Sequence, residues 1–394
     1  MINNVTDTIK YIGVDDHDID LFEGQYDVPE GMSYNSYLIM DEKTAVIDTV
    51  DAHKTEEFLS NIKEGLEGRS LDYIVVQHLE PDHSGSLKTV LETYPEAKIV
   101  SNAKVFSMIP QFFDIYLEDR KVVVAENDTL SLGQHTLTFV LAPMIHWPEV
   151  MMTYDSFDKV FFSADGFGKF GALDFDDPEG WACEARRYYF GIVGKYGMAV
   201  QTLLKKAANF DIEKILPLHG PVLPMPGDEL SYYLDTYNTW SSYQPETHGV
   251  FVAYASIHGN TAKAAKKIAE LLEAAGEKVA ISDLCREDMA ECVEDAFRYD
   301  RMVLCSSSYD AGVFLPMHDF LTHLTYKTYQ NRKIAILENG SWAPSAARTI
   351  KGIAEGWKNV TVLDPTVTIR STMKDSDMPS IEALVSAVVE AGRE

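Results

Sequence analysis

Short apolar runs separated by polar turns fill the first 245 residues of the chain. Their length and their content of valine, isoleucine and aromatic residues are typical of buried β-strands. The runs are YNSYLIMD (34–41), TAVIDTV (44–50), DYIVVQH (72–78), AKIVSN (97–102), KVVVAEND (121–128), LTFVLAP (137–143), VMMTYD (150–155) and KVFFSAD (159–165). Helical stretches are predicted at 54–67, 103–113 and 181–209. Many strands with few helices predict two sheets packed face to face with helices outside, an αββα sandwich.

The pattern changes after residue 249 to a regular alternation of strands and helices. The polar stretch SSYQPETHG (241–249) is predicted to link a first domain, 1–245, to a second domain, 249–394. The predicted strands of the second domain are VFVAYAS (250–256), KVAISDL (278–284), RMVLCSSS (301–308), KIAILENG (333–340) and VTVL (360–363), and a last helix follows at 379–392. Five strands joined by helical crossovers predict a doubly wound parallel sheet. The fold class is therefore α/β in both domains.

Charge and composition exclude several classes of protein. The net charge is −27, and residues 249–394 hold 16 basic and 20 acidic side chains, so most of the excess lies in the first domain. Such a chain is not expected to bind nucleic acid or an anionic membrane surface. No apolar run reaches the length of a membrane span and the start lacks the regions of a signal peptide, which predicts the cytoplasm. The four cysteines form no CxxC pair, so free thiols are expected.

Histidines and carboxylates gather where predicted strands end in the first domain. The stretch QHLEPDHSG (77–85) directly follows a strand, and three further candidates follow later strands. A single histidine is more often structural than a ligand, but carboxyl ends of strands are where α/β folds build their sites. Together these residues predict a metal centre. The candidate ligands are His78, Glu80, Asp82, His83, His146, Asp165 and His219.

Three loops of the second domain are candidates for binding a phosphorylated cofactor. Residues 256–261 join the first strand to a helix, and hydroxyls and amides at a helix N-terminus bind phosphate well. These loops contain neither GxGxxG nor GxxxxGK[ST], which argues against dinucleotide and nucleoside triphosphate loops. The loops after the third and fourth strands offer Tyr309 and Trp342 to cover a flat ring. The candidates are Ser256, Ile257, His258, Gly259, Asn260, Thr261, Ser306, Ser307, Ser308, Tyr309, Asp310, Ala311, Gly312, Asn339, Gly340, Ser341, Trp342 and Ala343.

The ligand spacing resembles the HxHxDH motif of the metallo-β-lactamase superfamily, with Glu80 in place of the second histidine. A carboxylate is a harder ligand than imidazole and favours iron over zinc. With this change, residues 2–245 resemble the diiron domain of the flavodiiron proteins. Residues 249–394 resemble the flavodoxins, which bind FMN. The resemblance covers nearly the whole chain and matches the two-domain form of the family.

This resemblance implies a set of cofactors, roles and partners. The cofactors would be FMN and two non-haem iron ions, with dioxygen reduced to water or nitric oxide reduced to nitrous oxide. One iron would be held by His78, Glu80 and His146, the other by Asp82, His83 and His219, and Asp165 would bridge them. Tyr26 and Tyr196 are candidates to donate protons or hydrogen bonds to bound oxygen; the alternative for each is a packed aromatic with its hydroxyl at the surface. The electron donor would be a rubredoxin or a reduced deazaflavin, and chains would pair head to tail as a homodimer or as a homotetramer made of two dimers.

Two other functions are compatible with parts of the sequence. One is a zinc hydrolase of the metallo-β-lactamase fold that carries a flavodoxin-like domain; His78 and His83 suit it, whereas Glu80 argues against it. The other is an electron carrier or redox sensor in which only the second domain works, although the full ligand set argues against that. The identity of the bound metal separates the first alternative from a reductase, and replacement of Asp165 separates the second.

Overall fold

The computed structural model describes residues 3–175 and 180–393, which form two compact units. The first unit comprises Met1–Tyr189 and Met198–Asn238, and the second comprises Phe190–Gly197 and Thr239–Glu394. Around the predicted linker, α7 (Leu230–Ser241) ends at residue 241 and β17 (Thr247–Ala255) begins at residue 247. The domain limits at 245 and 249 remain a prediction. No helix among the described residues is long and apolar enough to cross a membrane.

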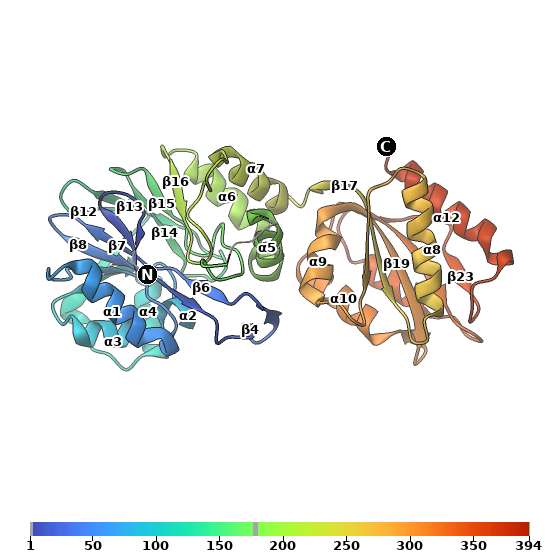
Figure 1. Ribbon diagram of the computed structural model, residues 1–394, viewed down its shortest axis with the longest axis horizontal. Helices are drawn as coiled ribbons and strands as arrows, with labels where there is room; N and C mark the ends of the chain where they lie inside the picture. Colours follow the sequence, from blue (N-terminus) through green and yellow to red (C-terminus); the bar gives the residue numbers. More distant parts are fainter. Residues whose placement is uncertain (1–2, 176–179, 394) are drawn as a thin grey trace. The chain divides into compact units, whose positions relative to one another are not determined.

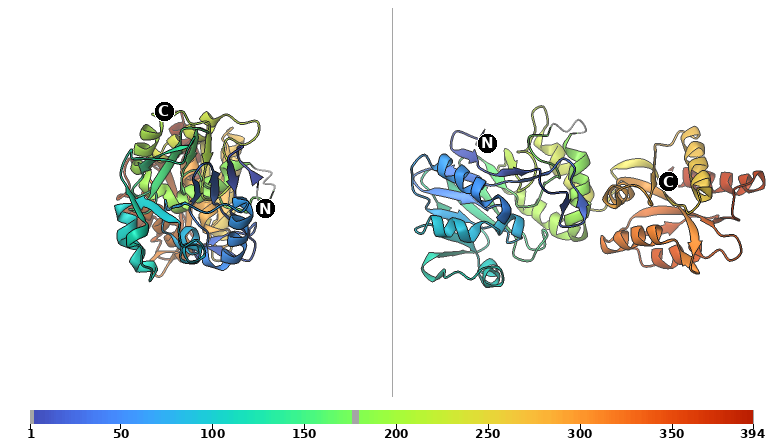
Figure 2. Two further views of the ribbon diagram at one scale, coloured as in Figure 1. Left: turned by 90° about the vertical axis from the view of Figure 1, so that its left-hand side faces the viewer. Right: turned by 60° about the horizontal axis from the view of Figure 1, so that its bottom comes forward.

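Two large sheets form the body of the first unit (Figure 1; further views in Figure 2), and β3 (Val14–Asp16) and β6 (Met32–Tyr34) form a separate two-stranded sheet. The first sheet has the order β1 (Asn3–Asn4), β2 (Ile9–Tyr11), β7 (Tyr37–Met40), β8 (Thr44–Ile47), β9 (Tyr73–Val75), β10 (Lys98–Asn102) and β11 (Lys121–Val124). The second has the order β12 (Thr129–Ser131), β13 (Thr136–Leu141), β14 (Met151–Asp155), β15 (Val160–Phe162) and β16 (Lys214–Leu216). Each apolar run given above for this half overlaps one of these strands, and β16 is the strand expected before His219. The sequence reasoning missed β1, β2 and β12.

The core of the first unit lies between the two sheets. Ile39 and Val75 of the first sheet pack in one buried cluster with Phe139 and Phe162 of the second. Outside, α1 (Thr55–Leu66) packs on β7 and α4 (Ala103–Phe112) packs on β10. The αββα sandwich is therefore confirmed. Its metal-site loops follow β9, β13, β15 and β16.

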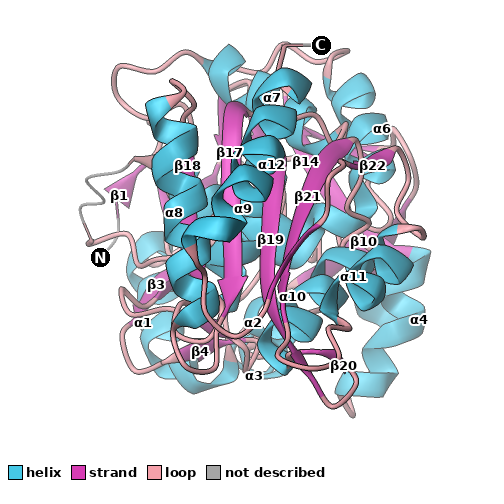
Figure 3. Cartoon of the chain, turned by 90° about the vertical axis from the view of Figure 1, so that its right-hand side faces the viewer, coloured by secondary structure: helices cyan, strands magenta, loops and turns pink. Residues whose placement is uncertain are grey.

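The second unit is a doubly wound parallel sheet, as predicted. Its main strands have the order β18 (Val279–Asp283), β17, β19 (Tyr299–Tyr309), β21 (Arg332–Asn339) and β22 (Val360–Val362), and all four pairings are parallel. Figure 3 shows β17, β19 and β21 side by side. Helices α8 (Asn260–Ala274) and α12 (Met378–Ala391) pack against one another, and α9 (Met289–Arg298) packs against α10 (Leu315–Tyr326) (Figure 1).

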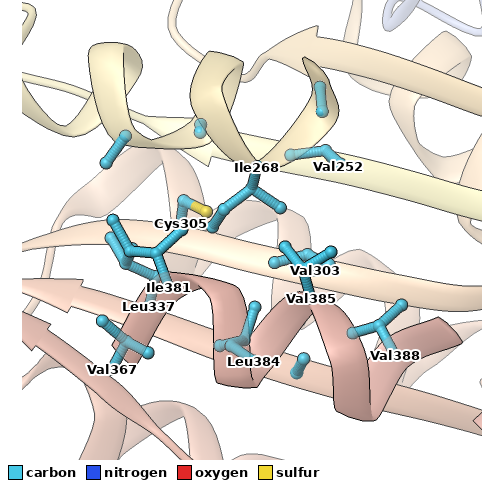
Figure 4. Packing of buried hydrophobic residues seen from close by; sticks show 14 of the residues in the cluster. Val252, Ile268, Val303, Cys305, Leu337, Val367, Ile381, Leu384, Val385 and Val388 are labelled. Atoms are coloured by element: carbon cyan, nitrogen blue, oxygen red, sulfur yellow. The ribbon is translucent and has the colours of Figure 1, made fainter. Parts of the chain in front are cut away.

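The central strands of this sheet are apolar and buried in their middle parts, at 250–255, 302–305 and 334–337, because helices cover both faces. Figure 4 shows Val303, Cys305 and Leu337 of the sheet packed with Ile268 of α8 and Ile381 of α12. The side chain of Cys305 is buried in this cluster, and all four cysteines are free thiols, as the sequence predicted.

Two parts of the first half differ from the sequence prediction. The expected helix over 181–209 is divided into α5 (Trp181–Tyr188), a π-helical turn (Tyr189–Val193), a 3-10 turn (Gly194–Tyr196) and α6 (Gly197–Ala207). The hydroxyl of Tyr243 donates to the Gly194 carbonyl at 2.8 Å, which helps to satisfy the backbone where the helix is interrupted. A small hairpin, β4 (Leu21–Phe22) and β5 (Tyr26–Asp27), was also missed because two-residue strands carry no periodic signal.

Candidate metal centre and flavin cleft

The first four candidate ligands lie on the turn after β9 and on the short helix α2 (Pro81–Ser84). Pro81 occupies the first helical position, where its fixed φ angle starts the helix directly after Glu80. The backbone N–H and the hydroxyl of Thr49 both donate to the His83 carbonyl, at 2.9 and 2.7 Å. The loop after β8 therefore holds the far end of this ligand-bearing segment.

Four of the seven side chains form one group around a common point. The Glu80 Oε2 atom lies 2.8 Å from Nε2 of His146 and 3.1 Å from Nε2 of His78. The Asp165 Oδ2 atom lies 3.2 Å from Nε2 of His78 and 3.5 Å from Nε2 of His146. Two imidazole nitrogens and two carboxylate oxygens thus converge from loops that follow β9, β13 and β15.

The other three side chains repeat this arrangement around the second Asp165 oxygen. The Asp82 Oδ2 atom lies 3.3 Å from Nε2 of His83 and 3.2 Å from Nε2 of His219. The Asp165 Oδ1 atom lies 3.0 Å from Nε2 of His83 and 3.7 Å from Nε2 of His219. All seven predicted ligands are brought together, and Asp165 gives one oxygen to each group.

These two groups fit a pair of metal ions. Ligand atoms about 2.1 Å from one metal lie about 3 Å from each other when they are adjacent, which matches the separations above. The atoms also lack better partners: both oxygens of Asp82 and Asp165, and Nε2 of His83 and His219, are buried without a well-aligned hydrogen bond among the described residues. Such atoms are costly to bury unless something binds them. Mixed imidazole and carboxylate donors suit iron.

The ionisation of the cluster also favours a bound cation. Burial alone would raise the pKa of Asp165, but His83 and His78 beside it lower that pKa well below its usual range. Burial alone would lower the pKa of the two histidines, yet Asp82 and Asp165 raise that of His83 to about 9, and Asp165, with Glu149 and Glu80, raises that of His78 well above its usual value. Protons on His78 and His83 thus balance the carboxylates beside them, and metal ions would take the place of those protons.

Asp48, which follows β8, fixes the start of the ligand turn. Its carboxylate accepts hydrogen bonds from the backbone N–H of Gln77 at 2.7 Å and of His78 at 3.3 Å, and from the Gln77 amide at 3.0 Å. Burial raises the pKa of Asp48 to about 6. Sequence reasoning missed this residue because its role depends on the pairing of β8 with β9.

An aromatic wall closes one side of the cluster. The ring centroids of Phe22 and Tyr188 lie 5.3 and 5.5 Å from that of His219. Burial, and then the charges of the nearby carboxylates, raise the pKa of the Tyr188 hydroxyl well above its usual value. Tyr188 was not predicted. Tyr26 packs against Phe170, at 5.6 Å, within the same aromatic group.

Tyr196, the other tyrosine predicted to act on bound oxygen, lies in the segment Phe190–Gly197, which belongs to the second unit by its contacts. The ammonium group of Lys195 lies 6.0 Å from the centroid of the Tyr196 ring. The role predicted for Tyr196 stays a prediction.

A third group of possible metal ligands, His135, Asp155 and Asp158, lies away from this centre. Here the side chains are bonded to one another and to neighbours: His135 Nδ1 lies 2.9 Å from Asp155, and His135 Nε2 lies 3.0 Å from the Thr8 hydroxyl. The hydroxyls of Thr6 and Thr8 donate to Asp158. We interpret this group as a hydrogen-bonded support for the N-terminal strands.

The group makes the stability of the first unit depend on pH. Burial alone would lower the pKa of His135, but Asp155, with Asp158 and Asp41 nearby, raises it above its usual value. Charged His135 then stabilises the fold fully below about pH 6.5, and this stabilisation is lost as pH rises through the raised pKa. Urea unfolding at pH 6 and pH 9 is expected to show that His135→Gln destabilises the protein more at the lower pH. An equal effect at both values would contradict this.

The cleft of the second unit has a volume of about 820 Å³ and lies where β17, β19 and β21 end. Between β17 and β19 the strand order reverses, which is where doubly wound sheets bind their ligands. Of the predicted residues, all line the cleft except Gly259, Ser306 and Gly312. The lining residues that were not predicted are Pro344, Ser345, Arg348 and Ser371.

Hydrogen bonds tie the three loops of the cleft together. The hydroxyls of Thr261 and Ser307 lie 2.9 Å apart, and the Asn339 amide donates to Thr261 at 3.2 Å. The Ser256 hydroxyl oxygen is buried without a hydrogen-bond partner among the described residues, next to the N-terminus of α8. An unsatisfied hydroxyl and a helix N-terminus are suited to a phosphate group. With Tyr309 beside it, the cleft has the chemistry and the size for FMN.

Comparisons with known proteins agree with both halves of this description. A family model described as ODP family beta lactamase matches residues 32–220. The anaerobic nitric oxide reductase flavorubredoxin of Salmonella arizonae is 30% identical over 355 residues, which cover 87% of this chain and 73% of that protein.

Solved structures match the fold along the whole chain. Rubredoxin oxygen:oxidoreductase from Desulfovibrio gigas has a TM-score of 0.91 at 23% identity, covering 100% of this chain and 99% of that one. The flavodiiron protein from Giardia intestinalis also has a TM-score of 0.91, at 24% identity, covering 100% of this chain and 96% of that one. Together with the sequence relatives, these matches place the protein: the chain belongs to the flavodiiron protein family.

Proposed function

We propose that this protein is a terminal reductase that passes electrons from FMN to a pair of irons, which reduce dioxygen to water or nitric oxide to nitrous oxide. One observation carries the proposal. A ligand set divided into two groups that share Asp165, with the carboxylate of Glu80 in one of them, occurs in the same chain as a cleft suited to FMN. The family membership established above supports it, because flavodiiron relatives are oxidoreductases with these cofactors.

When bound, the flavin would supply electrons singly or in pairs, and the irons would transfer them to the small oxidant. The chain itself would provide geometry. His78, Glu80 and His146 would hold one metal position; Asp82, His83 and His219 would hold the other. Asp165 would keep the two positions at a fixed separation, because each of its oxygens faces one group.

The aromatic wall would control the surroundings of the reacting molecule. Phe22, which packs against Phe170, would exclude water from the side of His219 that it covers. The Tyr188 hydroxyl, whose pKa is raised by burial, is protonated at neutral pH as tyrosines ordinarily are, so it could donate a hydrogen bond to an oxygen atom near the metal positions. A phenylalanine at this position would keep the packing and remove only that donor.

The donor and the assembly are inferred from the family resemblance. We expect a rubredoxin or a reduced deazaflavin as electron donor, a cytoplasmic location, and chains that pair head to tail as a dimer or a dimer of dimers. Pairing would let the flavin of one chain serve the metals of its partner. Sedimentation of the active protein tests the pairing, and a fully active monomer would contradict it.

The proposed activity is tested by gas consumption. Protein purified without oxygen and loaded with iron and FMN is reduced photochemically, and dioxygen or nitric oxide is added at known concentration. Rapid loss of either gas, with reoxidation of the flavin, is the expected result. If neither gas is consumed while the protein hydrolyses a thioester in the presence of zinc, the hydrolase function is correct instead.

A further inference from the structure

Glu149 lies behind the ligand His78. Its Oε1 atom is 2.8 Å from Nδ1 of His78 and accepts a second hydrogen bond, at 3.1 Å, from the backbone N–H of Leu79. The Asn102 amide donates to the Glu149 carbonyl at 2.7 Å, which fixes the backbone of this residue. Glu149 is almost fully buried, so its carboxylate is held against the ring of His78 with little contribution from solvent.

The four histidine ligands are not supported equally. Nδ1 of His219 lies 2.7 Å from the Ser33 carbonyl, which is a neutral acceptor. Nδ1 of His83 is buried and has no hydrogen-bond partner among the described residues. Within residues 3–175 and 180–393, His78 is the one ligand histidine whose Nδ1 meets a carboxylate. The two metal positions therefore have similar ligands but differ in the hydrogen-bond partners of their histidine ligands.

A carboxylate behind a histidine ligand has two effects. It fixes the tautomer, because the hydrogen on Nδ1 points to the carboxylate and leaves the Nε2 lone pair for the metal. It also raises the basicity of the ring, and loss of such a partner typically weakens metal binding by about 10–100-fold. The fixed tautomer and the higher basicity both concern the ring of His78, so they act on the metal position to which His78 belongs.

We propose that Glu149 is a positioning residue that strengthens metal binding at the position formed by His78, Glu80 and His146, and that it makes the two metal positions unequal. The next step rests on the proposed function, because it concerns the iron-loaded protein. There, the negative charge of Glu149 stabilises the oxidised metal ion at the position that His78 serves. The iron held there would be the harder of the two to reduce. The half-reduced state, with one electron on the other iron, would be populated over a wide range of potential.

The first test uses zinc and does not depend on the reductase function. The metal-free full-length protein is titrated with Zn²⁺ against a chelator, for the wild type and for Glu149→Gln, which keeps an oxygen that can accept both hydrogen bonds but removes the charge. We expect one of the two sites to bind about 10–100-fold more weakly and the other to be unchanged. Unchanged affinity at both sites, or an equal loss at both, would overturn the proposal.

A matched control separates this effect from a general loss of a buried carboxylate. Asp155 is also buried and also lies 2.9 Å from Nδ1 of a histidine, His135, but away from the metal centre. Asp155→Asn is expected to leave both zinc affinities unchanged. If Glu149→Gln fails to fold, a proton NMR spectrum of the zinc-loaded wild type serves as the test. The proposal requires a strongly deshielded Nδ1–H resonance from His78, and the absence of that resonance would overturn it.

The second test uses the iron-loaded protein. A redox titration followed by electron paramagnetic resonance measures how much of the half-reduced state accumulates. We expect the maximum of that signal to fall severalfold in Glu149→Gln and to stay unchanged in Asp155→Asn. An unchanged signal in Glu149→Gln would overturn the redox part of the proposal. A wild-type protein that binds zinc at both sites but takes up no iron would refute the reductase function and leave the zinc result standing.

Discussion

Asp165→Asn is expected to abolish gas reduction and to remove most of the bound metal, while FMN binding and flavin reduction stay intact. Among the seven ligands, Asp165 is the one that faces both groups, with Oδ2 toward His78 and His146 and Oδ1 toward His83 and His219. An asparagine has the same shape but carries no charge and offers one oxygen instead of two. Four imidazoles would then share two remaining carboxylates, so neither metal position would keep its full ligand set.

The measurement is metal analysis together with gas consumption on protein purified without oxygen. Asp155→Asn serves as control, because Asp155 is an equally buried aspartate paired with a histidine outside the centre. If the protein were an electron carrier or redox sensor, Asp165→Asn would lose its metal but would keep flavin reduction and every other activity. Full gas reduction by that variant would show that the centre is not where the reaction occurs.

Ser256→Asp is expected to abolish the binding of FMN. The Ser256 hydroxyl lies buried beside the N-terminus of α8, where the phosphate of FMN is expected. A carboxylate about 4 Å from a phosphate charge is unfavourable by about 4 kcal/mol at the effective dielectric constant of a protein surface. This corresponds to about a thousandfold weaker binding. The variant should therefore be purified without flavin and should keep its iron.

Ser386→Asp provides the matched control for the added charge. Ser386 is an exposed serine on α12 and does not line the cleft. FMN affinity, measured by the quenching of flavin fluorescence, should be unchanged in this variant. Normal FMN affinity in Ser256→Asp would mean that the phosphate binds elsewhere in the second unit.

Residues whose role depends on local sequence were predictable. The seven ligands follow strands that are apolar runs, and Glu80 alone changes the expected metal from zinc to iron. The three flavin loops also follow apolar runs, so fifteen of their eighteen predicted residues line the cleft. In both cases the functional residues directly follow an apolar run, and such a run predicts clearly where a strand ends.

Residues whose role depends on tertiary packing were not predictable. Phe22 reaches His219 through a hairpin of two-residue strands, and Tyr188 reaches it from the end of an interrupted helix. Arg348 and Ser371 line the cleft from segments that follow the predicted loops in the chain. Glu149 lies three residues after His146, but its contact is with His78, and only the folded chain brings the two together.

The metal and flavin content of protein purified without oxygen tests the central claim most directly. Elemental analysis and flavin extraction give the number of each cofactor per chain, before any assay of activity. We predict two irons and one FMN, bound by the seven ligands of the first unit and the cleft of the second. Two zinc ions in place of iron would contradict the reductase, and would mean that Glu80 does not select the metal.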